Sequence, residues 1–298
     1  MVGRFAPSPT GPLHLGSLRT ALAAWLFARA AGSGFLVRIE DLDPQRSRRE
    51  WEQEQLDDLQ ALGIDWDGVP VRQSERFGLY EAALQELSSV GRLYPCFCTR
   101  AEIRAAASAP HGDLPEGAYP GTCRAIAPAE RDARVAAGER HALRVDSGAV
   151  RVSYEDGLLG PQSHVIDDFV VRRADGVPAY QLAVVVDDAD QHIEQVVRGA
   201  DLADSTARQI LLARWLGLPV PAYAHVGLVL GADGARLAKR HGAATLADRD
   251  EPLEATLALL AHSLGLARDR DRVSSAHQLL EGFDPSALPR GPVTLGAR

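Results

Sequence analysis

Residues 4–17 combine a basic side chain, a turn-rich loop and a histidine in a pattern that suits phosphate binding. The segment reads RFAPSPTGPLHLGS, so Pro and Gly separate a short apolar run from the start of a helical pattern. A helix N-terminus presents unpaired backbone N–H groups and a partial positive charge, which favour a phosphate chain. His14 adds a side-chain donor, and Gly16 lets a nucleotide approach the backbone because it has no side chain. The segment predicts a nucleotide site.

Lysine is almost absent from the chain. Of 32 basic residues, 31 are Arg and one is Lys, namely Lys239. A lysine ammonium is a compact and mobile point charge, whereas an arginine guanidinium is a planar fork. Lys239 is therefore a candidate phosphate-binding residue. The alternative is a lysine on a surface loop without a role in chemistry.

All three cysteines fall in one short stretch, as Cys96, Cys98 and Cys123. An odd number argues against a disulfide framework and favours a metal site or free thiols. Two cysteines separated by one residue, followed by a third, are typical of tetrahedral zinc sites. His111 is a candidate fourth ligand, and three reduced thiols without a metal are the alternative.

Three carboxylates follow an apolar run at residues 184–186. Asp187, Asp188 and Asp190 have the oxygen ligands that a hard cation such as Mg²⁺ prefers. Acidic groups of this kind are common without any cation. The pattern therefore indicates a magnesium site only weakly.

The composition is that of an ordinary globular protein. The chain has 298 residues, of which 46% are hydrophobic and 24% are charged. No apolar run reaches the ~18 residues of a membrane helix, and the first residues do not resemble a signal peptide. We therefore expect a cytoplasmic protein without a membrane partner. The net charge of −8 disfavours an extended nucleic-acid surface, and Arg46, Arg48 and Arg49 are more typical of a solvated helix face.

The first ninety residues alternate between strand and helix patterns. Residues 2–6 and 35–39 are short and apolar, whereas residues 13–31 and 75–90 have helical spacing of apolar side chains. Ser47 and Glu50 have the spacing of a capping box before a further helix. This order predicts an α/β fold with a parallel sheet.

The pattern changes at Cys96, where Ala, Pro and Gly become frequent. Further strands are expected at residues 165–171, 192–197 and 223–230. A helix is expected at residues 205–216, capped by Asp204 or Ser205, and another at residues 253–264. We predict four parts, namely residues 1–95, an insertion at 96–164, a second half of the catalytic domain at 165–245, and a helical tail at 246–298.

Residues 4–17 resemble the first signature, called HIGH, of the class I aminoacyl-tRNA synthetases, in the form of the glutamyl branch. Residues 37–43 resemble the second block of that branch, and residues 236–240 resemble its KMSKS loop. The resemblance covers roughly residues 1–245 and implies a Rossmann-like catalytic domain that activates glutamate with ATP and Mg²⁺. Two positions depart from the pattern. Ser17 replaces the second His of HIGH, and Ala238 replaces the Ser of KMSKS.

The resemblance also implies roles for individual residues. The two arginines would contact the carboxylates of glutamate, and the acidic residue would contact its amino group. The residues that would bind glutamate are Arg4, Ala6, Ser8, Glu40, Tyr180 and Arg198. The residues that would bind ATP are His14, Gly16, Ser17, Lys239 and Arg240, with His14, Gly16 and Lys239 catalytic.

Residues 119–123 resemble a Tyr-x-x-x-Cys pair of a small relative of glutamyl-tRNA synthetase, in which the Tyr binds zinc. This resemblance implies one structural zinc held by Cys96, Cys98, Tyr119 and Cys123, and it favours Tyr119 over His111.

The same relative attaches glutamate to the queuosine base in the anticodon of tRNA(Asp). Only 298 − 239 = 59 residues follow Lys239, fewer than the ~100–150 of a typical independent domain. We therefore expect no anticodon-reading domain, a monomer, and queuosine-containing tRNA(Asp) as partner. The rivals are an enzyme that charges the 3′ end of tRNA, and a non-catalytic paralogue that binds glutamate and ATP, or RNA.

Overall fold

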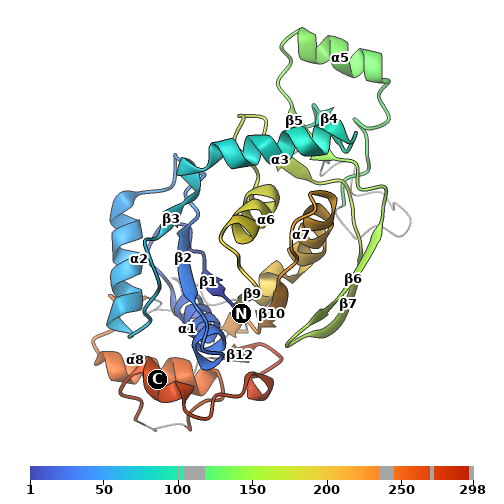
Figure 1. Cartoon of the computed structure of the whole chain (residues 1–298). Coiled ribbons are helices and arrows are strands. Elements are labelled where there is room, and N and C mark those ends of the chain that lie inside the picture. The colour runs from blue at the N-terminus through green and yellow to red at the C-terminus, as the bar shows by residue number, and fades with distance from the viewer. Residues whose placement is uncertain (100, 104–117, 232, 235–244, 269–271, 295–298) are drawn as a thin grey trace.

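A seven-stranded sheet forms the centre of the molecule (Figure 1). The computed structural model describes residues 1–99, 101–103, 118–231, 233–234, 245–268 and 272–294. The first six strands of the order β3-β2-β1-β9-β10-β6-β7 pair in parallel, and β6 and β7 form an antiparallel hairpin. The bounds are β1 Gly3–Phe5, β2 Phe35–Ile39, β3 Val71–Arg72, β6 Arg151–Asp156, β7 Gly160–Val165, β9 Gln195–Gly199 and β10 Ala222–Val226.

Helices cover both faces of this sheet. Successive strand residues point to opposite faces, and Val196 accordingly lies in one apolar cluster whereas Val197 lies in the other. The cluster with Val197 contains α1 and α8, and the cluster with Val196 contains α6 and α7. The bounds are α1 Leu15–Ala30, α2 Arg49–Ala61, α3 Phe77–Ser89, α6 Tyr180–Asp190, α7 Ala203–Trp215 and α8 Leu253–Ser263, with short 3-10 helices at Gln73–Glu75, Ala200–Leu202, Ala276–Leu280 and Pro285–Ala287.

A second, antiparallel sheet carries the cysteines at one end of the molecule. Its strands are β4 Leu93–Cys96, β5 Ala142–Val145 and β8 Val170–Arg172, in the order β4-β5-β8. Helix α5, Pro128–Ala136, extends beyond this sheet and buries none of its residues. Figure 1 shows this region far from α8.

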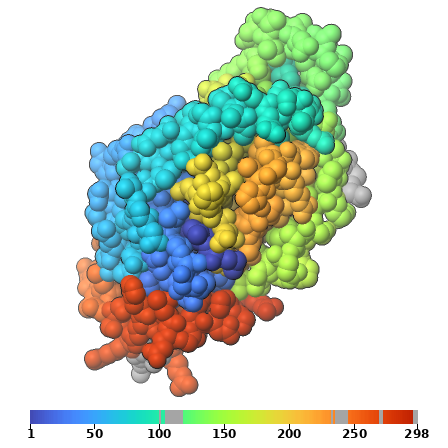
Figure 2. Space-filling view, viewed as in Figure 1, coloured from blue at the N-terminus to red at the C-terminus, as the bar shows by residue number. Residues whose placement is uncertain are grey.

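The C-terminal residues pack as a layer against the helix that starts the catalytic unit. Figure 2 shows this layer in red, against the blue N-terminal residues. Leu257 and Leu260 of α8 share an apolar cluster with Leu22 and Leu26 of α1. The last described strand, β12 (Val293–Thr294), pairs in parallel with β11 (Val229–Leu230). None of the described helices is long and apolar enough to span a membrane.

The α/β class predicted from the sequence is confirmed, but two predicted helix caps are wrong. Helix α2 follows Arg48 as its N-cap, with no side-chain cap, so Ser47 does not start a capping box. The backbone N–H of Arg48 instead donates to Pro9 O at 2.9 Å, which ties this turn to the loop of residues 6–12. Helix α7 follows Leu202 and continues a 3-10 turn, so neither Asp204 nor Ser205 is its cap.

Three strand boundaries also differ from the sequence prediction. The run at 165–171 is interrupted, because β7 ends at Val165 and β8 begins at Val170. The run at 192–197 begins later, since His192 has a φ of 54° and forms a turn before β9. Residues 223–230 divide at Gly227 into β10 and β11.

The expected insertion shares its strands with both sheets. The hairpin of β6 and β7 falls within residues 96–164, yet Asp156 of β6 pairs with Tyr223 of the central sheet. Strand β8 falls outside that range, yet it pairs with β5. The four-part division therefore stays a prediction.

Candidate active site

A cavity of about 610 Å³ opens where the parallel strands β1, β2 and β9 end. Ligands of open α/β sheets bind beyond the carboxyl ends of the strands, where the strand order reverses. Here the reversal lies between β1 and β9, because the chain continues to β2 and β3 on one side and to β10 on the other. The described residues for which the resemblance implied a role with glutamate or ATP all line this cavity, namely Arg4, Ala6, Ser8, His14, Gly16, Ser17, Glu40, Tyr180 and Arg198.

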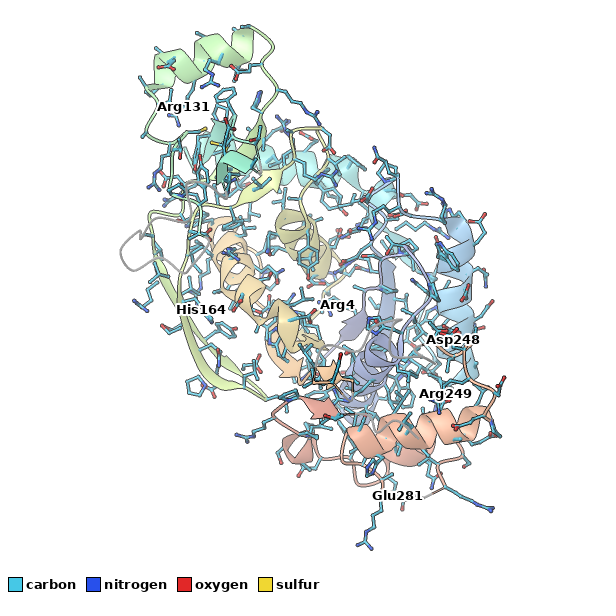
Figure 3. All side chains as sticks on the ribbon, turned by 180° about the vertical axis from the view of Figure 1, so that it is seen from behind. Arg4, Arg131, His164, Asp248, Arg249 and Glu281 are labelled. Carbon is cyan, nitrogen blue, oxygen red and sulfur yellow. The ribbon has the colours of Figure 1, made fainter. Side chains whose placement is uncertain are left out.

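A buried group of charges lies beside the cavity. Arg4 Nε donates to Asp188 Oδ1 at 3.3 Å, and Arg38 Nη1 donates to the same oxygen at 2.7 Å. Arg38 Nη2 reaches Glu40 Oε1 at 3.4 Å. Figure 3 labels Arg4 deep in the interior, far from Arg131 on α5. Two guanidiniums and two carboxylates thus share one buried network beside the cavity.

The carboxylates of this network have opposite pKa shifts. Burial raises the pKa of Glu40, and the nearby guanidiniums of Arg38 and Arg4 only partly oppose it. Burial acts in the same direction on Asp188, but Arg38 and Arg4 outweigh it and lower the pKa of that carboxyl. Asp188 therefore favours its ionised form, which binds the arginines. Burial disfavours the ionised form of Glu40, so a cation in the cavity would stabilise it.

Arg198 faces the cavity from the end of β9. Its Nη1 donates to Tyr180 Oη at 3.2 Å, and its Nη2 donates to Thr206 Oγ1 at 2.7 Å and to Leu202 O at 3.3 Å. Its Nε lies 3.1 Å from His225 Nε2. The side chain is only 5% exposed, so its guanidinium is held in one orientation.

His14 is the N-cap of α1, and its ring is fixed by the residues that follow it. Its Nδ1 accepts a hydrogen bond from the backbone N–H of Ser17 at 3.1 Å, which caps the helix. The Ser17 hydroxyl lies 3.2 Å from Nε2, so the serine that departs from the HIGH pattern still contacts this histidine. A Cβ at Gly16 would lie 3.1 Å from His14 Nδ1, which explains the need for glycine there.

A described residue just beyond the segment that resembles KMSKS contacts this helix start. Lys239, Arg240 and Ala238 lie outside the described residues, as does His111. Thr245, six positions after Lys239, forms an antiparallel bridge with His14. On the other side of the segment, Val229 lines the cavity. Thr245 thus contacts a residue that lines the cavity, and Val229 lines it directly.

The acidic residues at the end of α6 are ion-pair partners of arginines. Asp187 accepts hydrogen bonds from Arg76 Nε at 2.7 Å and Gln73 Nε2 at 2.8 Å, and from the Tyr80 hydroxyl. Asp190 pairs with Arg76, and Asp188 with Arg4 and Arg38. Guanidiniums thus neutralise the carboxylates that the sequence weakly indicated as a magnesium site, so this interpretation is wrong.

The three cysteines converge with one tyrosine. Their sulfur atoms lie within 4.8 Å of one another, and within the described residues no other cluster of three or more His, Cys, Asp or Glu has a metal-binding arrangement. The Tyr119 hydroxyl lies 3.5 Å from Cys96 Sγ and 3.5 Å from Cys98 Sγ, and it accepts from the backbone N–H of Cys123 at 2.8 Å. The three sulfur atoms and the phenol oxygen thus lie close together, and this donor set could hold a metal ion such as zinc.

Residues 1–287 match the family described as tRNA synthetases class I (E and Q), catalytic domain. The chain belongs to this family. It is 56% identical to the Glutamyl-Q tRNA(Asp) synthetase of Nocardia farcinica, with 97% of this chain and 91% of that protein covered. It is 50% identical to the protein of the same name from Symbiobacterium thermophilum, with 100% and 96% covered.

Solved structures of class I tRNA synthetases have the same fold. A glutamate tRNA ligase from Elizabethkingia meningosepticum, in complex with its amino acid, is similar to this chain with a TM-score of 0.86 and 27% identity. That match covers 100% of this chain and 67% of the ligase. The glutamate-tRNA synthetase of Elizabethkingia anophelis gives a TM-score of 0.87 at 27% identity, with 100% and 68% covered.

Sequence reasoning missed several polar residues that organise this class I synthetase site. Arg38 and Asp188 were not connected, although a charged side chain between Val37 and Ile39 in a central strand signals a buried partner. His225 and Asp156 gave no such signal, because neither belongs to a signature and they are 69 positions apart.

Proposed function

We propose that the protein activates glutamate with ATP and transfers the glutamyl group to the queuosine base of tRNA(Asp). The observation that carries this proposal is the convergence on one cavity of two arginines, one carboxylate and a helix N-terminus with His14. The high identity with relatives named Glutamyl-Q tRNA(Asp) synthetase supports the same activity.

The amino-acid end of the cavity matches the charges of glutamate. Arg4 and Arg198 attract its two carboxylates, and Glu40 attracts its ammonium. Four of the N–H donors of Arg198 have partners within the protein, which leaves one N–H of Nη1 for a substrate carboxylate. Ala6, Ser8 and Tyr180 complete the wall.

Activation needs no side-chain nucleophile. A carboxylate oxygen of glutamate forms a bond to the α-phosphorus of ATP, and the bond between that phosphorus and the pyrophosphate oxygen breaks. Such transfers depend on positioning and on neutralising the charge of the phosphoryl oxygens. Lys239, Arg240 and the start of α1 supply positive charge, His14 supplies a side-chain donor, and Mg²⁺ enters with ATP.

Glutamate-dependent exchange of label between pyrophosphate and ATP tests the activation step without RNA. We expect exchange with glutamate, and little with aspartate or glutamine. Lys239→Arg should lower the exchange rate by a factor of ~10²–10³, the typical effect of losing one preorganised contact, with an unchanged thermal melt. No exchange under any condition would favour the non-catalytic paralogue, and exchange that requires tRNA would favour the 3′-end charging enzyme.

The acceptor is the queuosine base. Its cyclopentenediol presents two neighbouring hydroxyls as a ribose does, so the same acyl transfer can serve. Bases in single-stranded loops can be splayed out and selected by a pocket. Labelled glutamate should enter queuosine-containing tRNA, also after its 3′ terminus is trimmed, and should not enter tRNA from a queuosine-deficient strain. Labelling that requires the 3′ terminus and not queuosine would contradict this acceptor.

We propose that Cys96, Cys98, Tyr119 and Cys123 hold one structural zinc. The donor set fits because three sulfurs and one phenol oxygen lie close together. Bound zinc would tie β4 to the turn at residues 119–123. Elemental analysis should give close to one zinc per chain. Tyr119→Phe should weaken zinc retention more than His111→Ala, and the opposite order would assign the fourth ligand to His111. A cytoplasmic location and a monomeric state stay predictions.

A further inference from the structure

A line of buried hydrogen bonds connects three neighbouring strands of the central sheet and ends at the cavity. Asp156 on β6 contacts His225 on β10 through its Oδ2 and the Nδ1 of the ring. On the other side of the ring, Arg198 on β9 places its Nε 3.1 Å from Nε2. The three side chains are 1%, 0% and 5% exposed. The contacts between the three side chains are therefore shielded from bulk water.

The chemistry of the two ends fixes the proton of the imidazole. An ionised carboxylate only accepts hydrogen bonds, so Nδ1 of His225 carries a proton and donates to Asp156. A guanidinium only donates, so Nε2 must offer a lone pair to Arg198. The neutral ring with its proton on Nδ1 satisfies both neighbours at once. Burial, together with the positive charge of Arg198, lowers the pKa of His225 despite the opposing effect of Asp156, which agrees with a neutral ring.

Further contacts leave the guanidinium little freedom. Thr206 Oγ1 lies 2.7 Å from Arg198 Nη2 and 3.1 Å from His225 Nε2, so it closes a triangle with the two side chains. On the cavity side Arg198 Nη1 donates to Tyr180 Oη at 3.2 Å. His225, Thr206 and Tyr180 thus together fix the direction in which Arg198 presents its remaining N–H.

We propose that His225, oriented by Asp156, is a positioning residue that fixes Arg198 and thereby sets the affinity for glutamate and its selection over glutamine. The proposal rests on the proposed role of Arg198 in binding a substrate carboxylate. A fixed guanidinium attracts the carboxylate anion of glutamate by its charge and its remaining N–H, whereas the amide of glutamine is neutral and meets that N–H donor against donor whenever its NH₂ group faces Arg198. A guanidinium that can rotate would avoid this conflict, and the selection would weaken.

Asp156→Asn tests the proposal with a small change in structure. The Oδ1 atom of Asp156 accepts from the backbone N–H groups of Leu158, Leu159 and His225 at 3.0, 2.9 and 3.1 Å. An asparagine oxygen can keep these three bonds, so only the atom that faces His225 Nδ1 changes. The NH₂ group of the asparagine would donate to Nδ1 of His225. The ring proton would then sit on Nε2, where it would face the Nε–H of Arg198.

The readout is pyrophosphate exchange, measured with varied glutamate, glutamine and ATP. For Asp156→Asn we expect the KM for glutamate to rise on the order of 10- to 100-fold, as misplaced binding groups do. The preference for glutamate over glutamine should fall, and the KM for ATP should stay within a factor of ~2. Ser153→Ala is the matched control, because this exposed residue lies on the same strand and contacts only Ser163; it should change none of these values.

A second pair of variants, at His225, tests the same proposal if Asp156→Asn folds poorly. His225→Gln retains an acceptor for Arg198 and should raise the KM for glutamate less than His225→Leu, which has none. In the His225→Leu background, Asp156→Asn should add no further loss of glutamate selection, because the two residues act through one contact.

Three results would overturn the proposal. These are an unchanged KM for glutamate in Asp156→Asn, an equal rise of the KM for ATP, or an equal effect of His225→Gln and His225→Leu on the KM for glutamate. Arg198→Lys separates this failure from that of the proposed function. If Arg198→Lys raises the KM for glutamate and Asp156→Asn does not, only the positioning role fails. If Arg198→Lys leaves that KM unchanged, the proposed glutamate site itself is wrong.

Discussion

The two ends of the cavity each depend on a fully buried arginine, but the two arginines have opposite surroundings. At the proposed amino-acid end, Arg38 is 0% exposed and contacts the carboxylates of Asp188, Glu40 and Asp187. At the proposed nucleotide end, Arg19 of α1 is 1% exposed, and its hydrogen bonds to Ser263 and Gly227 involve only neutral oxygens.

The pKa values of the two guanidiniums reflect this difference. Burial lowers the pKa of Arg38, but three carboxylates outweigh it and the net shift is upward. Burial alone lowers the pKa of Arg19 to about 10. Arg38 therefore balances charges that a substrate will meet. Arg19 instead joins three segments, namely α1, the cavity wall at Gly227 and the end of α8.

The comparison teaches that the two ends are stabilised by different means. The proposed amino-acid end is a set of charges on β1, β2 and α6. The proposed nucleotide end is a backbone wall that Arg19 connects to the end of α8. Substitutions at the first end should affect stability and glutamate binding, and substitutions at the second should affect ATP binding.

The largest effect is expected from Arg38→Met. Removing one partner from a buried ion pair typically costs about 3–5 kcal/mol, because a buried charge loses its compensation. Asp188 would keep only the contact with Arg4 at 3.3 Å. Urea denaturation gives the free energy of unfolding. Arg173→Met is the control, since its pair with Asp175 is largely exposed and should contribute about 0–1 kcal/mol. Equal losses in the two variants would contradict the difference between buried and exposed pairs.

Arg19→Met should have a smaller effect on stability and a specific effect on ATP. It leaves the carbonyl oxygens of Gly227 and Ser263 without this donor, which costs about 1–3 kcal/mol for each unsatisfied group. Gly227 and its neighbours Leu228 and Val229 line the cavity, so the KM for ATP should rise while the KM for glutamate stays within a factor of ~2. A rise in the KM for glutamate alone would reverse the assignment of the two ends.

Two glycines allow a matched test of the C-terminal layer. A Cβ at Gly227 would lie 1.9 Å from the backbone oxygen of Gly291, so Gly227→Ala must displace β12 from β11. A Cβ at Gly291 would meet no atom within 4 Å. Gly227→Ala should cost about 1–3 kcal/mol, as overpacked substitutions do, and should raise the KM for ATP. Gly291→Ala should behave as wild type in denaturation and kinetics. Similar behaviour of both variants would show that the layer does not support the wall.

The smallest effect concerns the pH dependence of glutamate binding. The ionised form of Glu40 attracts the substrate ammonium, and the pKa of Glu40 is raised, mainly by burial. A raised pKa means that the ionised form is lost at a higher pH than for an ordinary carboxylate. As the pH falls from about 8 to 5, the KM for the substrate should therefore begin to rise at a higher pH than it would if the side chain of Glu40 had an ordinary pKa. Glu40→Gln should bind weakly at every pH, and an unaltered pH profile in that variant would assign the titration to another group.

Motifs whose residues lie close together in the sequence were enough to predict much of the site. The segment at 4–17 is continuous in the chain, so its strand, loop and helix start could be read directly, and Glu40 follows a clearly apolar strand. The cysteines and Tyr119 lie within 28 positions, from 96 to 123, and they do converge. These features could be predicted because the residues that form each of them lie close together in the chain.

The buried polar pairs could not be predicted in the same way. Arg38 on β2 and Asp188 on α6 are 150 positions apart, and only the tertiary fold brings them together. The predicted cap at Ser47 failed because the N–H of Arg48 is already bonded to Pro9. The strand expected at 165–171 is broken because Asp167 and Asp168 turn toward Arg208 and Tyr94. In each case a partner distant in sequence decided the local structure.

The order of the central sheet also bears on how the protein behaves at high concentration. Sheet edges with free N–H and C=O groups can recruit strands of other chains, which leads to aggregation. In the described sheet, one edge is β3, with only two residues, and the other is β7, which begins with Gly160 and Pro161 and continues with polar side chains up to His164. Short strands and proline are poor templates for strand addition. Both edges of the sheet are therefore protected against self-association.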